Sequence, residues 1–438
     1  MDAWQARKLV RSKQQDGDIR TPFQRDKARI MHAASFRRLQ AKTQVVGVGI
    51  SDFYRTRLTH SLETAQIGTG IVAHLRTVQS ELSNQLNLDE YLIETICLAH
   101  DIGHPPFGHG GEVALHYMMS ENGGFEGNGQ TFRILTTLES YSEDDGMNLA
   151  SRSLLGVLKY PQYLDNLMQD IQYPDKPARF AKVNTEQWIP PKGIFRCDQL
   201  AFDWVLSPLS SDDKNTFMST AKNANNIPKT QFKSVDCSIM ELADDIAYAI
   251  HDLEDAVVMS LIDQMKYHNE VTNQLKTLDI PLFNQHAAEI ENKIFSGKTY
   301  PLKSAIGALV NLFITAIRLK TLNRFNEPLL NHNAYLPDNY ALALNIFKHF
   351  VFKHVIRKPE IQILEFKGQQ MIMEMFEVFA NEPTRLLPEN TARRWQLADG
   401  SHMQMRVIAD YISGMTDEYA NRVYANLFLP KSHRITDR

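Results

Sequence analysis

Residues 90–101, Glu-Tyr-Leu-Ile-Glu-Thr-Ile-Cys-Leu-Ala-His-Asp, form an apolar segment that ends in a histidine and an aspartate. Eight of the ten residues before His100 are apolar or small, and Leu92 and Ile96 recur at helical spacing. The pattern predicts a buried helix. Asp101 is then a buried carboxylate beside an imidazole, an arrangement that costs several kcal/mol unless the carboxylate has a charge partner. A divalent cation is such a partner.

Two further positions carry the same types of ligand. His60 stands at the start of a predicted helix, and Asp244 lies on a long predicted helix whose apolar stripe extends from Ile239 to Ala256. Taken alone, each has an ordinary explanation, because a single histidine is more often a surface or hydrogen-bonded core residue and a helical aspartate is more often solvated. Together, two imidazoles and two carboxylates form a mixed shell that suits Mg²⁺, Mn²⁺, Fe²⁺, Co²⁺ or Ni²⁺ better than a closed thiolate zinc site does.

The helix that carries Asp244 places further polar groups beside it. At about 100° per residue, Tyr248 and Asp252 fall within about 80° of Asp244, whereas Asp245 points elsewhere. Such a ladder could bind a metal at one end and substrate hydroxyl groups further along. The competing interpretation is a solvated helix face.

The turn after Asp101 carries more titratable side chains. Residues 102–112 read Ile-Gly-His-Pro-Pro-Phe-Gly-His-Gly-Gly-Glu, in which the prolines end the helix and the glycines let the backbone approach a ligand closely. His104, His109 and Glu112 lie on this turn beside the predicted metal site. Their clustering favours a catalytic role over the alternative of a Gly-Pro turn with surface histidines.

The composition excludes several classes of protein. The chain has 438 residues with a net charge of −4, 43% hydrophobic and 22% charged residues, which is typical of a globular protein and not of a disordered, collagenous or coiled-coil one. Its three cysteines do not form a disulfide framework or a metal knuckle, so we expect a cytoplasmic location. No window approaches the roughly 18 apolar residues of a membrane span, and no signal-peptide pattern is seen, so we expect no membrane partner.

Helical periodicity dominates the chain and predicts an all-α fold. The predicted units are an N-terminal arm (1–19), a catalytic domain (20–260) and a C-terminal helical region (261–438). Helices are expected over 304–320 and 403–427 in the last unit. A proline- and aromatic-rich stretch at about 173–228 predicts an irregular insertion, with a short hairpin around Lys192-Gly193. Basic residues concentrate between Arg20 and Arg57, which favours a bound polyanion, although a solvated basic helix face gives the same pattern.

The order His60, His100-Asp101 and Asp244 resembles that of the HD-domain metallophosphohydrolases, and the sequence around it is similar to their dGTP triphosphohydrolase-like branch. A bare H…HD…D pattern is weak evidence, but a series of ordered blocks over nearly the whole chain is specific. The blocks lie at residues 20–26, 36–45, 54–63, 98–112, 124–130, 155–160, 243–255 and 410–420.

The resemblance implies a helical enzyme of dNTP pool control that hydrolyses dGTP or another dNTP to the deoxynucleoside and inorganic triphosphate. It implies one divalent metal ion per subunit. Mg²⁺ or Mn²⁺ is favoured as this ion over Fe, Co, Ni or Zn. The matches to the family's metal ligands are His60, His100, Asp101 and Asp244. His109 and Glu112 match residues placed at the α-phosphate, and His104 matches a nearby histidine. The matches to the nucleoside pocket are Arg57, Arg38, Gln44, Tyr248 and Asp252, the last three near the sugar, where they disfavour a 2′-hydroxyl group.

One departure and several alternatives follow from the same comparison. Gly127 and Gly129 stand where many members carry His and Ala, so the catalytic burden here falls on His109. The chain could instead be another HD phosphohydrolase, a nucleotide phosphatase or phosphodiesterase, or a nucleotide- or single-stranded-DNA-responsive regulator with little activity. The resemblance also implies a homo-oligomer, a hexamer, that responds to a nucleotide or single-stranded DNA effector.

Overall fold

The computed structural model describes residues 3–9, 17–44, 55–139, 141–142, 145–223 and 227–430. Helices build most of this part of the chain, and its strands form two short antiparallel pairs. The predicted all-α class is therefore confirmed. Within these residues, no helix combines the length and the apolar character that crossing a bilayer requires.

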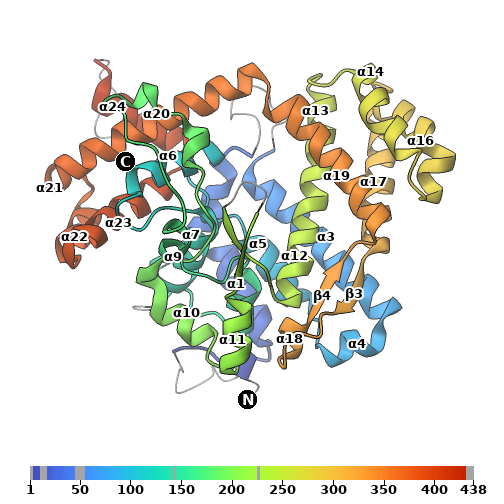
Figure 1. Ribbon diagram of the computed structural model, residues 1–438, viewed down its shortest axis with the longest axis horizontal. Helices are drawn as coiled ribbons and strands as arrows, with labels where there is room; N and C mark the ends of the chain where they lie inside the picture. The colour runs from blue at the N-terminus through green and yellow to red at the C-terminus, as the bar shows by residue number, and fades with distance from the viewer. Residues whose placement is uncertain are drawn as a thin grey trace.

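Three helices form the centre of the fold. They are α3 (Arg57–Val78), α5 (Glu90–Ala99) and α12 (Val235–Ile246), and each packs against the other two (Figure 1). α5 is buried along most of its length, as its apolar sequence predicts. Gly68 permits the close approach of α3 to α5, because a Cβ atom at that position would lie 2.8 Å from the Sγ atom of Cys97.

The starts of these helices are fixed by side-chain caps. Thr56 and Thr59 form a reciprocal capping box at the start of α3, and the Asp89 side chain accepts a hydrogen bond from the Leu92 amide at the start of α5. Such caps satisfy amide groups that a helix leaves unpaired. The box at α3 sets the orientation of its first turn, which carries His60.

The other helices before α12 surround this centre, and α1 packs on α5. They are η1 (Ala3–Gln5), α1 (Pro22–His32), α2 (Ala34–Arg38), η2 (Leu39–Ala41), α4 (Ser80–Gln85), α6 (Gly108–Met119), α7 (Gly127–Arg133), η3 (Ile134–Leu138), α8 (Ser151–Val157), α9 (Leu164–Met168), η4 (Phe180–Lys182), η5 (Thr185–Trp188), η6 (Arg196–Asp198), α10 (Gln199–Val205) and α11 (Ser211–Phe217).

The stretch predicted to be irregular is irregular only in its first part. Residues 169–195 carry short 3₁₀ turns, but residues 196–217 are mainly helical. The hairpin predicted around Lys192-Gly193 is wrong, because Ile194 forms a parallel bridge with Tyr163. Gly193 serves a close approach to the 162–164 backbone, since a Cβ atom there would lie 2.6 Å from the carbonyl oxygen of Gln162.

The strands lie elsewhere. They are β1 (Thr220–Lys222), β2 (Pro228–Thr230), β3 (Arg318–Thr321) and β4 (His332–Tyr335). Thr220 stands opposite Thr230 in the first pair, and Arg318 stands opposite Tyr335 in the second. Because β3 follows at once, the helix predicted over 304–320 ends at Ala316.

The C-terminal part of the chain is helical. Its helices are η7 (Ala247–His251), α13 (Asp252–Val258), α14 (Gln264–Tyr267), η8 (His268–Thr272), α15 (Asn273–Leu275), α16 (Pro281–Ile294), α17 (Thr299–Ala316), α18 (Pro328–Asn331), α19 (Asp338–Val351), η9 (Phe352–Ile356), α20 (Pro359–Asn381), α21 (Pro383–Leu386), α22 (Glu389–Leu397), α23 (Gly400–Ser413) and α24 (Asp417–Phe428). The region predicted to be helical over 403–427 contains two helices. The first ends at Ser413 with Gly414 as its C-cap, and Thr416 caps the start of the second.

Two hydrophobic cores hold these elements together. The first surrounds α3, α5 and α12 and continues through α17 and α19 to Val355. The second joins α6 and the 183–195 stretch to α20, α23 and α24. The C-terminal helices therefore pack directly on α6 (Figure 1), the helix whose first turns carry His109 and Glu112.

Candidate active site

The packing of α3, α5 and α12 brings four predicted ligands together. The Nε2 atom of His60 lies 3.1 Å from Oδ1 of Asp244, and Nε2 of His100 lies 3.7 Å from the same oxygen. Candidate ligand atoms of His60, His100 and Asp101 all lie within 4.8 Å of one another. Side chains separated by up to 184 positions in the sequence thus face a common point.

The hydrogen bonds around His100 fit metal ligation. Its Nδ1 lies 2.6 Å from the carbonyl oxygen of Cys97, so Nδ1 carries the proton and Nε2 presents a lone pair. That buried Nε2 has no hydrogen-bond partner within the described residues. A histidine whose tautomer is fixed by a backbone carbonyl and whose other nitrogen faces carboxylates is a typical metal ligand. The group of His60, His100 and Asp101 can therefore hold a metal ion.

The charges around the cluster keep its carboxylates ionised. Burial alone would raise the pKa of Asp244, but the neighbouring imidazoles of His100 and His60 and the charge of Lys159 hold that pKa well below its ordinary value. Burial opposes the charge on His100, yet Asp101 and Asp244 give a net rise in the pKa of that histidine. Ionised oxygen ligands are the form that a divalent cation needs.

Asp101 has two close partners besides the cluster. Nη1 of Arg57 lies 2.5 Å from Oδ2 of Asp101, and Nδ1 of His104 lies 2.9 Å from Oδ1. Against the effect of burial, Arg57 and the two histidines hold the pKa of Asp101 well below its ordinary value. The structure thus places Arg57, which was expected in the nucleoside pocket, in a buried contact with a candidate metal ligand.

His109 and Glu112 form a pair at the start of α6. Nδ1 of His109 lies 3.0 Å from Oε2 of Glu112, and the His109 side chain is 71% exposed whereas that of Glu112 is 4% exposed. Glu112 also accepts a hydrogen bond from the Gly127 amide at 2.7 Å. Burial would raise the pKa of Glu112, but His109 and Lys192 lower it. An ionised Glu112 orients the His109 ring and leaves Nε2 available for proton transfer.

Gly127 lies beside this pair. A Cβ atom at Gly127 would lie 3.2 Å from Oε1 of Glu112 and 3.3 Å from Nε2 of His104. A side chain here would enter the space between those two groups. The absence of a histidine at position 127 therefore leaves His104 and His109 as the imidazoles of this turn, with ring centroids 6.0 Å apart.

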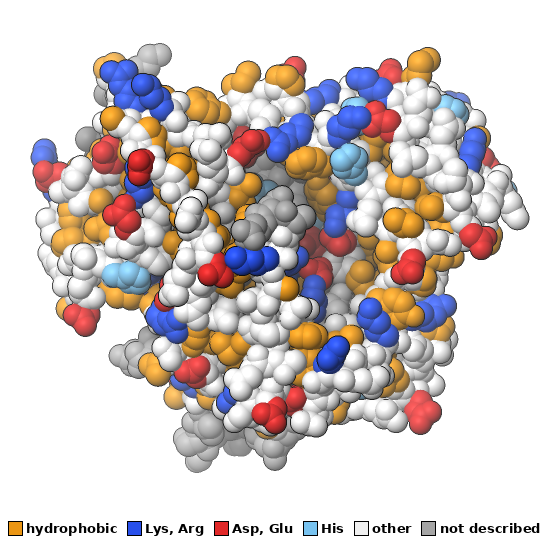
Figure 2. All heavy atoms as spheres, viewed as in Figure 1, with side chains coloured by type: hydrophobic (Ala, Val, Ile, Leu, Met, Phe, Trp, Pro, Cys, Tyr) orange, Lys and Arg blue, Asp and Glu red, His pale blue; other side chains and the backbone are white. Residues whose placement is uncertain are grey.

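Three lysines that the sequence analysis did not name as site residues lie at the cluster or near Tyr160. Nζ of Lys159 lies 3.5 Å from Oδ2 of Asp244, and Nζ atoms of Lys192 and Lys229 lie 5.7 and 5.8 Å from the Tyr160 ring centroid. Lys192 also lowers the pKa of Glu112. Positive charge therefore reaches the site from Lys159 in the 155–160 block and from Lys192 in the 173–228 stretch. These two lysines were not assigned to the site from the sequence. Figure 2 shows a hollow near the middle of the visible face of the molecule, with basic and acidic side chains on its walls.

The expected sugar-binding residues lie in two places. Tyr248 belongs to the π-helical turn η7 and Asp252 begins α13, so the straight α-helix predicted from Ile239 to Ala256 is interrupted between them. π-helical turns widen the helix and shift the residues that follow, and they are frequent at functional sites. Burial raises the pKa of Tyr248.

Asp252 is buried and both of its carboxylate oxygens lack a hydrogen-bond partner within the described residues. Its nearest cation is Arg55, with Nη1 at 3.8 Å, and Arg55 lies closer to Glu63 and Asp255. Burial raises the pKa of Asp252 to about 8, although Arg55 opposes the rise. Unpaired buried oxygens of this kind are acceptors that a hydroxyl group could satisfy.

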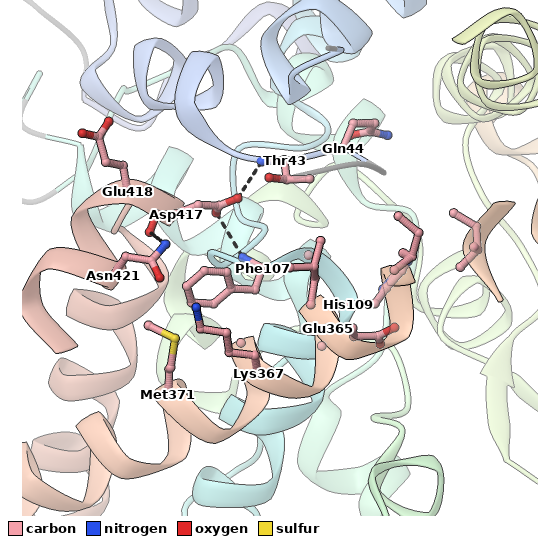
Figure 3. Close-up of a pocket in the computed structure, with 16 residues that line it drawn as sticks. Thr43, Gln44, Phe107, His109, Glu365, Lys367, Met371, Asp417, Glu418 and Asn421 are labelled. Carbon is pink, nitrogen blue, oxygen red and sulfur yellow. Dashed lines mark hydrogen bonds between the residues drawn. The ribbon is translucent and has the colours of Figure 1, made fainter. Parts of the chain in front are cut away.

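A pocket of about 430 Å³ opens beside His109. It is lined by Gln44, by Phe107 to Gly110 and by residues of α20 and α24 (Figure 3). Gln44 and His109 thus share one pocket, and the Gln44 Oε1 atom is buried without a hydrogen-bond partner within the described residues. Tyr248 and Asp252 lie outside the described residues that line it. Arg38 is exposed at the end of α2, with its guanidinium close to Gly414.

The helical fold with a His, His-Asp and Asp group at its centre is that of an HD-domain protein. Residues 57–155 match the HD domain, and residues 334–426 match the phosphohydrolase-associated domain. The chain therefore belongs to the HD phosphohydrolases.

Full-length relatives narrow this class. The chain is 55% identical over 434 residues to the deoxyguanosinetriphosphate triphosphohydrolase-like protein of Shewanella halifaxensis. The aligned region covers 98% of this chain and 97% of that protein. It is 55% identical to the protein of the same name from Shewanella pealeana, with 99% and 98% covered, and 54% identical to that from Shewanella woodyi, with 98% and 96% covered. The chain belongs to the deoxyguanosinetriphosphate triphosphohydrolase-like family, as its sequence blocks indicated.

Proposed function

We propose that this protein is a metal-dependent dNTP triphosphohydrolase, which cleaves a deoxynucleoside triphosphate at the α-phosphate into the deoxynucleoside and inorganic triphosphate. The observation that carries the proposal is the meeting of His60, His100, Asp101 and Asp244 beside the His109–Glu112 pair. The names of the relatives agree with this activity.

The chain's own residues supply the remaining parts of such a site. The lysines at positions 159 and 192 provide positive charge for the triphosphate, and fixed charges facing a reacting phosphate are a large source of rate enhancement. His109, oriented by Glu112, transfers a proton at Nε2 to or from the reacting phosphate or the leaving 5′ oxygen. A divalent cation bound by the cluster would supply Lewis acidity toward a water molecule and the α-phosphoryl oxygens.

The nucleoside end of the substrate has two candidate contacts. The pocket beside His109 lies within the roughly 300–1,000 Å³ range of ligand sites, at about 430 Å³, and it contains Gln44. The second candidate is the unpaired carboxylate of Asp252 together with the phenol of Tyr248, both of which lie outside the described residues that line this pocket. We propose that these three side chains contact the sugar and disfavour a 2′-hydroxyl group.

Product analysis tests the proposal. The Mn²⁺-loaded protein is incubated with each of the four dNTPs and with GTP, and the products are separated by ion exchange. Inorganic triphosphate released from a dNTP in one step supports the proposal, whereas orthophosphate or a nucleoside monophosphate favours another HD phosphohydrolase. Binding without turnover favours a nucleotide-responsive regulator. A homo-oligomer and a nucleotide or single-stranded DNA effector stay predictions from the resemblance, and a cytoplasmic location stays a prediction from the cysteine content.

A further inference from the structure

The 410–420 block contains Asp417, the first residue of α24, and the side chain of this aspartate binds two distant backbone amides. Its Oδ2 accepts a hydrogen bond from the Thr43 amide at 2.9 Å, and its Oδ1 accepts one from the Phe107 amide at 3.1 Å (Figure 3). Asp417 is buried. One carboxylate of the C-terminal region therefore bonds the backbone of two segments that lie far away in the sequence.

The Phe107 amide leads directly into the catalytic turn. Phe107 has a φ of 63° and Gly108 a φ of 58°, and His109 follows them. A bulky residue in the left-handed region is strained and persists only where its surroundings hold it. Gly368 of α20 is part of that support, because a Cβ atom there would lie 2.5 Å from the Cβ atom of Phe107.

The Thr43 amide leads into the other side of the site. Thr43 precedes Gln44 and forms an antiparallel bridge with Thr56, the cap of α3. In addition, the Arg57 amide donates to the carbonyl oxygen of Lys42 at 3.1 Å. Asp417 is thus joined through a short backbone path to the start of the helix that carries His60.

Another aspartate of the 410–420 block, Asp410, has a purely structural role. Asp410 binds the side chains of Arg133 and Gln130, with Nε of Arg133 at 2.9 Å from its Oδ1, and so attaches α23 to α7. Asp417 instead binds backbone amides at the two edges of the site. The C-terminal helices are therefore attached to the body of the protein independently of Asp417.

We propose that Asp417 is a positioning residue, which fixes the His109-bearing turn and the Gln44 segment relative to each other. The inference rests on the proposed function, and it makes the C-terminal helices part of the support of the active site. An Asn at this position has one oxygen acceptor, so one of the two amides would face an NH₂ group.

Steady-state kinetics of the full-length Mn²⁺-loaded Asp417→Asn protein tests this role. A misplacement of about 1 Å costs about 100-fold in rate, so we expect kcat to fall by about that factor and the preference for dGTP over GTP to weaken. Phe313→Leu, a change in the buried core of α17, is the control for general destabilisation. At a matched loss of Tm, Phe313→Leu should keep its kcat and its preference for dGTP.

Amide hydrogen exchange gives a second measurement that needs no activity. In the wild type, the Thr43 and Phe107 amides should be protected, and Asp417→Asn should lose protection at one of these two amides at least, while the α5 amides keep theirs. Wild-type protein that hydrolyses no dNTP contradicts the proposed function, and the exchange rates then still test the position of Asp417. Unchanged exchange at both amides, or a kcat loss no larger than that of Phe313→Leu, overturns the inference.

Discussion

Replacing His109 by alanine should separate chemistry from folding. The His109 side chain is 71% exposed, so its removal takes little surface out of the core and should leave Tm nearly unchanged. The variant loses the proton-transfer group held by Glu112, and general acid–base catalysis contributes about 10²- to 10⁴-fold. At about 1.36 kcal/mol per tenfold change in rate, the expected loss of transition-state stabilisation is about 3–5 kcal/mol.

The assay is dGTP turnover by ion-exchange analysis, together with Tm and the metal content of each protein. The chain offers a matched control, because His286 and Glu289 on α16 form the same type of i,i+3 pair at 3.1 Å, away from the site. His286→Ala should keep wild-type kcat. Turnover by His109→Ala equal to that of His286→Ala would refute the role of His109, and loss of bound metal in His109→Ala would show that the defect is not confined to proton transfer.

Two other changes test the charges of the site. Lys192→Ala should lower kcat/KM by about 10- to 100-fold, since a hydrogen bond to a charged group contributes about 1.5–3 kcal/mol. Lys182 is an exposed lysine of the same stretch, and Lys182→Ala is the control. Equal kinetics of the two variants would contradict a contact between Lys192 and the triphosphate. Asp252 takes up a proton on folding because its pKa is raised from 3.8 to about 8, so its contribution to stability falls as the pH rises through that interval. Asp252→Asn should therefore raise Tm more at pH 8 than at pH 5 in thermal scans, and an equal shift at both would show that the carboxyl group titrates normally.

Local sequence patterns predict the parts of the site that depend on one helix at a time. The apolar run before His100 specifies a buried helix, and the helical periodicity that begins near His60 places that histidine at the start of a helix, as observed. Asp244 lies on a helix as predicted because α12 is a regular α-helix up to Ile246. Each of these features follows from side-chain spacing within a few turns.

The remaining features depend on contacts that spacing does not encode. The π-helical turn at Ala247–His251 is a change of hydrogen-bond register within an otherwise helical pattern. Lys192 comes from a stretch without periodicity, and its position depends on the bridge between Tyr163 and Ile194. The bond from the Phe107 amide to Asp417 joins residues 310 positions apart. Such long-range contacts follow from how the helices pack.

The metal content of Asp244→Ala tests the central claim most directly. Asp245 is the matched control, because it is the adjacent aspartate on α12 and pairs with Lys348 at 2.6 Å. After loading with Mn²⁺ and removal of free ion, mass spectrometry should find one ion per chain in the wild type and in Asp245→Ala, and little in Asp244→Ala. A full complement of metal in folded Asp244→Ala would contradict a shared cation site built from His60, His100, Asp101 and Asp244.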